Sequence, residues 1–140
     1  MIVIAMTMAL ALAACGGSDD GGGTGATGAT ASTGDRPSST AKLSIVAPKV
    51  GQVVDGSDVD LRVKLQGAKL VPATTTNIVP DEGHLHVILD DTLISMTEGL
   101  EQTIPDVPPG EHRIMVEFVA SDHAPFDPRV VSVVAFEVKP

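Results

Sequence analysis

The stretch DVDLRVKLQ, residues 58–66, decides the fold class because apolar and polar side chains alternate along it without a break. Its apolar members are Val59, Leu61, Val63 and Leu65, and every residue between them is charged. Successive side chains of a β-strand point to opposite faces, so this period of two places one face on a core and the other in water. The stretch therefore predicts a half-buried strand of an antiparallel sheet.

Strand-like segments continue on both sides of this one, across residues 42–140. Pro and Gly residues separate them, as in PPG at 108–110, and no segment shows the 3.6-residue period of a helix. About seven short strands in a domain of this length are typical of the antiparallel β-sandwich of immunoglobulin or fibronectin type III domains, which we therefore predict. The further strands expected are 43–47, 85–90, 92–96, 102–104, 112–120 and 130–138.

The composition limits what such a domain can do. The chain has 140 residues, enough for one ordinary domain, with no Trp or Tyr and a formal net charge of −9. A nucleic-acid-binding protein needs a basic surface, so we expect neither DNA nor RNA as a partner. The single cysteine, Cys15, excludes an internal disulfide framework.

The N-terminal residues have the character of an export signal. The sequence IVIAMTMALALAA at 2–14 is uncharged and apolar. A membrane-spanning helix needs about 20 apolar residues, so this shorter run fits the hydrophobic region of a secretion signal. Leu12-Ala13-Ala14-Cys15 resembles the bacterial lipobox, in which a lipidated cysteine follows small residues. We therefore expect a lipoprotein signal peptide at 1–14, a lipid on Cys15, and an exported protein anchored to the bacterial cell membrane.

A segment rich in small and polar residues follows the cysteine. Positions 16–41 contain eight Gly and nine Ser or Thr among 26 residues, and no Val, Ile, Leu, Met or Phe. Such a segment buries too little apolar surface to offset its ordering entropy. We therefore predict that residues 15–41 form a lipidated, flexible tether and that residues 42–140 form the folded domain.

The motif GHLHVILDD at 83–91 carries two histidines in alternating positions. Leu85 and Val87 must face the core, because aliphatic side chains continue along that face. His84 and His86 then project together from the outer, exposed face, close enough to ligate one metal ion.

Topology brings a third histidine to the same place. In an immunoglobulin-like sandwich the strand 85–90 runs antiparallel beside the strand 112–120, so its beginning lies next to the end of that strand. His123 follows directly. Imidazole is a ligand that both Zn(II) and Cu(II) accept. The sequence therefore predicts a copper or zinc site formed by His84, His86 and His123, with a water or the carboxylate of Asp122 or Asp127 as fourth ligand. The alternative is that all three histidines make local hydrogen bonds only.

The remaining histidine, His112, lies at the opposite end of the sheet. GEHRI at 110–114 puts it two residues before the inward-facing Ile114. Immunoglobulin-like domains hold a tyrosine at this corner, and this chain has none. We predict that His112 replaces that tyrosine as a hydrogen-bonded structural residue.

Four segments together carry a resemblance: GHLHVILDD, PPGEHRIMVEF, ASDHAPFDP and VAFEVKP. They are similar to a group of bacterial secreted immunoglobulin-like domains with GHxH and DHxP motifs, which includes a GHHH-signature family of unknown function. The resemblance implies the fold and the exported setting, and no activity comes with it. Leu85 stands where the GHHH signature has its middle histidine. A looser similarity is to the periplasmic copper-carrier sandwiches, although Met96 and Met115 stand far apart in this chain.

The sequence lacks the motifs of an enzyme. It has no GxSxG, no HExxH and no P-loop, so we expect a non-catalytic protein. The leading hypothesis is a membrane-anchored binding or interaction module, and the second is a copper- or zinc-binding envelope protein. An apolar strip on the outer face of the sheet predicts a docking surface for a protein partner, unless segment 92–104 covers it. Its members are Ile88, Met115, Val119, Val131 and Val133.

Overall fold

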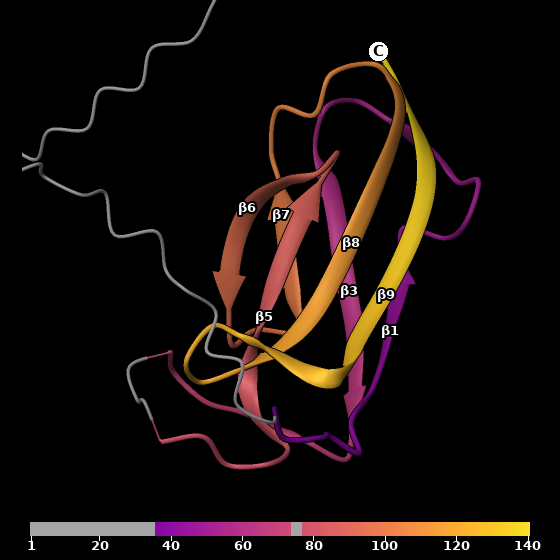
Figure 1. The fold of residues 1–140 in the computed structure, drawn as a ribbon. Helices are drawn as coiled ribbons and strands as arrows, with labels where there is room; N and C mark the ends of the chain where they lie inside the picture. Colours follow the sequence, from indigo (N-terminus) through magenta and orange to yellow (C-terminus); the bar gives the residue numbers. More distant parts are fainter. Residues whose placement is uncertain (1–35, 74–76) are drawn as a thin grey trace, which may run out of the picture. The chain divides into compact units, whose positions relative to one another are not determined.

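A computed structural model describes residues 36–73 and 77–140 and shows two β-sheets that enclose one core (Figure 1). The smaller sheet has three antiparallel strands in the order β1-β3-β7. In the strand that decided the fold class, inward side chains are buried and the charged ones exposed, which confirms the alternation. The strands are β1 (Lys42–Ala47), β3 (Val59–Gln66) and β7 (Glu101–Ile104).

The larger sheet follows the order β2-β9-β8-β5-β4, and β6 also pairs with β5. Its central pairs, β5 with β8 and β8 with β9, are antiparallel. All the strands expected from the sequence are present, which confirms the predicted immunoglobulin-like sandwich. Two further strands, β2 and β4, have only three and two residues, too few to show a period. The strands are β2 (Val53–Asp55), β4 (Lys69–Leu70), β5 (Glu82–Leu89), β6 (Thr92–Thr97), β8 (Gly110–Ala120) and β9 (Pro125–Lys139).

Both sheets contribute aliphatic side chains to the core. All three phenylalanines of the chain lie in it: Phe118 stacks on Phe126 with ring centroids 5.3 Å apart, and Phe136 is buried. The rest of the core is built mainly from small branched side chains, the residues that favour strands. The most deeply buried are Val59, Leu61, Leu85, Val87, Val107, Ile114 and Val116.

The ordered contacts of the domain begin before the predicted boundary at residue 42. Arg36 forms an ion pair with Asp122, at 2.6 Å between Nη1 and Oδ2. Asp81 accepts hydrogen bonds from the Ser39 hydroxyl at 2.7 Å and from the Thr40 backbone N–H at 2.6 Å. Residues 36–41, which the prediction includes in the tether, thus contact the domain through polar side chains rather than apolar burial. The boundaries of the tether stay a prediction.

The expected signal peptide, Cys15 and the tether up to residue 35 lie outside the described residues. In the part of the chain that the structure does describe, no helix has the length and apolar character needed to cross a membrane.

Gly83, the first residue of the GHLH motif, allows a close approach of β5 to β8. A Cβ atom at this position would lie 1.9 Å from the carbonyl oxygen of Val119 and 2.9 Å from its carbon. No real Cβ atom tolerates such a contact, and the obstacle is backbone that cannot turn away. Glycine at this position therefore sets how β5 begins, one residue before His84.

We predict that Gly83→Ala destabilises the domain by about 3 kcal/mol, because the added methyl group forces β5 away from β8. Urea unfolding followed by circular dichroism measures the change. The control is Lys64→Ala, an exposed position of β3, which should change the free energy of unfolding by less than about 0.5 kcal/mol. A Gly83→Ala protein as stable as the wild type would contradict the close approach.

Candidate metal centre

Three histidine rings meet at one end of the larger sheet. His84 Nε2 lies 3.1 Å from His86 Nε2 and 3.2 Å from His123 Nδ1. One nitrogen from each ring belongs to a group whose members all lie within 4.8 Å of one another. The structure thus brings together the three residues expected from the sequence. Two nitrogens at about 2.05 Å from a tetrahedral zinc or copper ion lie about 3.3 Å apart, close to the separations found here.

Strand pairing explains how these rings meet. His84 and His86 alternate with Leu85 and therefore share the outer face of β5. The register pairs Gly83 with Ala120, so β5 begins beside the end of β8. The β8–β9 turn comes next and carries His123.

The turn holds His123 in an unusual backbone conformation. Its φ is +64°, in the left-handed region, and its N–H donates to the carbonyl oxygen of Ala120 at 3.0 Å. The Ala120 N–H in turn donates to the Ala124 carbonyl at 3.0 Å. Few residues other than glycine adopt this conformation, although histidine does so more often than most.

The cluster is buried at one side and open at the other. His84 is only 1% exposed, His86 is half-buried and His123 is exposed. The expectation that both strand histidines lie on an exposed face is therefore wrong for His84. Residues 77–81, directly before β5, and the β8–β9 turn lie at this end (Figure 1), where the Ser121 hydroxyl donates to the Asn77 carbonyl at 3.0 Å.

The hydrogen bonds of His84 are incomplete for a purely structural residue. Its Nδ1 is buried without a hydrogen-bond partner, and its Nε2 contacts only the two other imidazoles. Leaving a buried polar atom unpaired costs about 1–3 kcal/mol. An ordinary core histidine pairs both of its nitrogens, whereas His84 pairs only Nε2, so local hydrogen bonds leave this residue incompletely satisfied.

The surroundings keep two of the rings neutral. Burial, together with the neighbouring His86 and His123, lowers the pKa of His84 from 6.5 to about 4. Burial and His123 also lower the pKa of His86, against the opposing charge of Glu117. A metal ion binds the unprotonated imidazole, and the lowered pKa values favour that form of both rings.

The predicted carboxylate ligands do not join the cluster. Arg36 donates to both carboxylate oxygens of Asp122, at 2.6 and 3.0 Å, and thereby lowers the pKa of that carboxyl group. Asp127 is exposed and is not among the grouped ligand atoms. The structure therefore does not support Asp122 or Asp127 as fourth ligand, and it assigns Asp122 to the contact that holds residue 36.

The positions of two side chains beside the cluster were not predicted from the sequence. Glu117, only 5% exposed, lies opposite His86 on β8, and Met96 lies opposite His86 on β6. A residue opposite a known position is found from the register of two strands, and the alternation of β6 and β8 alone does not fix that register.

His112 has both ring nitrogens satisfied. Nδ1 lies 2.6 Å from the Asp90 carboxylate, and Nε2 lies 2.7 Å from the carbonyl oxygen of Pro108, four residues upstream. A corner tyrosine makes the same kind of bond to upstream backbone. Burial lowers the pKa of His112, but the hydrogen bonds with Asp90 and Pro108 outweigh it and raise the pKa overall.

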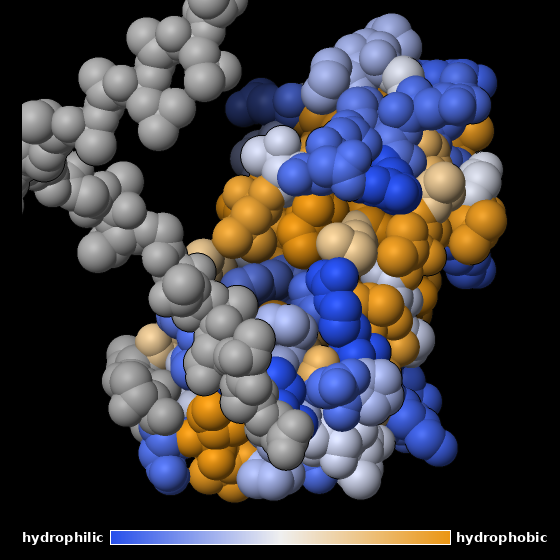
Figure 2. All heavy atoms as spheres, viewed as in Figure 1, coloured by the Kyte–Doolittle hydropathy of each residue, from blue (hydrophilic) through white to orange (hydrophobic). Residues whose placement is uncertain are grey.

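The apolar strip on the outer face is present in a shortened form. Leu93, Ile88, Met115 and Val133 are cross-strand partners in one row, and Figure 2 shows a hydrophobic band across this face. Segment 92–104 does not cover the row, because β6 extends the sheet edge and β7 joins the other sheet. Val119, expected in the strip, is buried instead. Docking of a protein partner on this row stays a prediction.

The fold and the cluster together define the class, an immunoglobulin-like β-sandwich with three histidines at one end. No family model and no curated protein matches the chain. It is similar to fibronectin(III)-like modules from Clostridium thermocellum, at 22% identity over 69% of this chain and 94% of that one, with a TM-score of 0.49. A human PKD domain has 16% identity, coverage of 85% and 93%, and a TM-score of 0.44. A CARDB domain from Pyrococcus furiosus, described as in complex with di-metal ions, has 17% identity, coverage of 76% and 96%, and a TM-score of 0.42.

We predict a pH-dependent loss of stability for His112→Phe, which keeps a ring but removes both hydrogen bonds. The raised pKa means that His112 stabilises the fold fully below pH 6.5 and loses this effect as the pH rises through its folded-state pKa. Urea unfolding should show a loss of about 1–2 kcal/mol at pH 5.5 and a smaller one at pH 9. The control, Glu111→Gln, alters an exposed neighbour and should show neither. Equal losses at both pH values would contradict a charged contact with Asp90.

Proposed function

We propose that this protein is an exported, lipid-anchored binding module that acts without catalysis and holds one copper or zinc ion through His84, His86 and His123. The observation that carries the proposal is the convergence of three imidazole nitrogens on one point, with separations of 3.1 and 3.2 Å from the central one. Three histidines with a remaining open position are a common ligand set for zinc, and copper accepts imidazole equally well.

The surroundings of the cluster favour a cation. The chain has a net charge of −9, which raises the local concentration of positive ions near its surface. Burial keeps His84 unprotonated, and the exposed His123 leaves the cluster open to solvent on one side. His84 is thus held in an unprotonated form on the buried side of the cluster, and an ion can enter from water on the side of His123.

We predict that the full chain binds one Cu(II) or Zn(II) ion and that His84→Ala weakens this binding at least tenfold, because the central ligand is removed. Isothermal titration calorimetry at pH 7 measures both. The control is His112→Ala, which removes a histidine at the other end of the sheet and should leave the affinity unchanged. Since the pKa of His84 is about 4, acidification to pH 6 should not protonate this ligand. Absence of binding, or binding unchanged in His84→Ala, would remove the proposal.

The anchoring part of the proposal is supported by the sequence alone. The apolar run at 2–14, the small residues before Cys15 and the Gly-rich segment after it have the order of a bacterial lipoprotein signal. The resemblance to secreted domains with GHxH and DHxP motifs supports the same setting. The lipid would hold the chain to the outer side of the cell membrane.

We predict that the protein incorporates a labelled fatty acid in a bacterial host and that Cys15→Ser abolishes the label. The substitution removes the acceptor thiol, so the precursor should also stay unprocessed and run larger on a gel. His112→Ala serves as the control and should be labelled like the wild type. A Cys15→Ser protein that remains membrane-bound at the size of the wild type would show that the lipoprotein interpretation is wrong.

A further inference from the structure

His86 has a partner of different chemistry on each side. In the register of the larger sheet, it lies opposite Met96 on β6 and opposite Glu117 on β8. Paired residues of neighbouring antiparallel strands point to the same face, with Cβ atoms about 4.5–5.5 Å apart. Both side chains are therefore within reach of an ion held by His86, and each offers a different donor atom for the fourth position.

Glu117 already forms an ion pair with Arg129. Its two carboxylate oxygens accept hydrogen bonds from Arg129 Nε at 2.7 Å and from Arg129 Nη2 at 2.6 Å. The side chain is almost completely buried in this bidentate arrangement, and its oxygens are not among the grouped ligand atoms. Moving it to an ion would leave the guanidinium without its partner, so the carboxylate is a poor fourth ligand.

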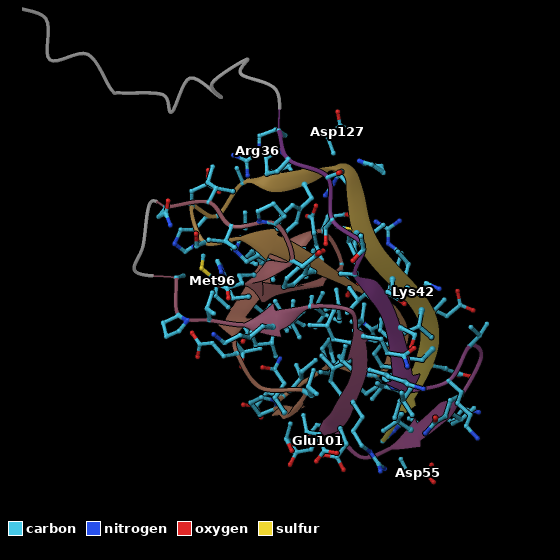
Figure 3. All side chains as sticks on the ribbon, turned by 90° about the horizontal axis from the view of Figure 1, so that it is seen from below. Arg36, Lys42, Asp55, Met96, Glu101 and Asp127 are labelled. Atoms are coloured by element: carbon cyan, nitrogen blue, oxygen red, sulfur yellow. The ribbon has the colours of Figure 1, made fainter. Side chains whose placement is uncertain are left out.

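The side chain of Met96 is free to change its rotamer, whereas Arg129 holds that of Glu117 in place. The side chain is 53% exposed, and Figure 3 shows its sulfur at the surface of the domain. The unbranched side chain has three rotatable bonds, so the thioether can swing toward the histidines without any change of backbone. Met96 also lies in the row of His86 and Glu117, next to the apolar row of Leu93 and Ile88 and not within it.

We propose that the sulfur of Met96 is the fourth ligand of the cluster and that the ion held there is copper(I); this inference rests on the metal-binding function proposed above. Thioether sulfur is a soft donor that favours Cu(I) over the harder Zn(II), while imidazole suits both. Three imidazoles and one thioether surround a Cu(I) ion with four neutral donors. Met96 is therefore the residue that sets the preference among metals.

The test compares Met96→Leu with Met115→Leu in the full chain. Leucine keeps the volume and the apolar character, so the fold should be retained. Met115 is the other methionine among the described residues, on the same outer face but in the apolar row. Cu(I) affinity is measured anaerobically by competition with a chromophoric Cu(I) chelator, and Zn(II) affinity by calorimetry.

We predict that Met96→Leu weakens Cu(I) binding at least tenfold and leaves Zn(II) binding within twofold of the wild type, while Met115→Leu changes neither. X-ray absorption at the copper edge should show a sulfur neighbour in the wild type and in Met115→Leu, and none in Met96→Leu.

The outcomes separate this inference from the proposed function. Cu(I) bound equally well by Met96→Leu, or without a sulfur neighbour in the wild type, overturns the role of Met96 while three-histidine binding stands. Equal weakening of Cu(I) and Zn(II) in Met96→Leu also overturns it, since the change would then be structural. A wild-type chain that binds neither ion overturns both proposals.

Discussion

The pairing of β5 with β8 is the constraint on which the rest of the structure depends. Its register places Leu85 opposite Phe118 on the core side and His86 opposite Glu117 on the outer side. Because side chains alternate, a slip of one residue would move the histidines into the core and the aliphatic side chains out of it. The core and the histidine cluster are thus specified by the same hydrogen-bond ladder.

Gly83 marks the end of that ladder. A Cβ atom at this position would clash with the Val119 carbonyl, so the two strands come closer at this point than a side chain would allow. In the register of these strands, the end of β8, which leads into the turn of His123, lies beside Gly83 and His84. The glycine of the GHLH motif therefore contributes to the cluster through backbone spacing, without any donor atom of its own.

Local patterns in the sequence predict the parts of the fold that repeat along one strand. The alternation at 58–66 and at 84–89 identifies two strands and the faces of their side chains, and the topology of the sandwich then places His123. The burial of His84 could not be predicted in this way, because alternation assigns this residue to the outer face and does not say what packs against that face. The contact of Arg36 with Asp122 joins residues 86 positions apart, and a local sequence pattern cannot predict such a pair. The position of Met96 opposite His86 follows only from the register of β6 on β5, which contains an irregularity after Val87.

Arg36 has a mechanical consequence. It is the first residue of the described domain, and its guanidinium contacts the turn that carries His123 through Asp122, Ala124 and Pro125. A pull on the chain from its N-terminal side therefore reaches the β8–β9 turn before it reaches any strand of the smaller sheet. The ion pair with Asp122 and the hydrogen bonds to the carbonyls of Ala124 and Pro125 thus connect the N-terminal side of the chain to the turn that holds the third imidazole.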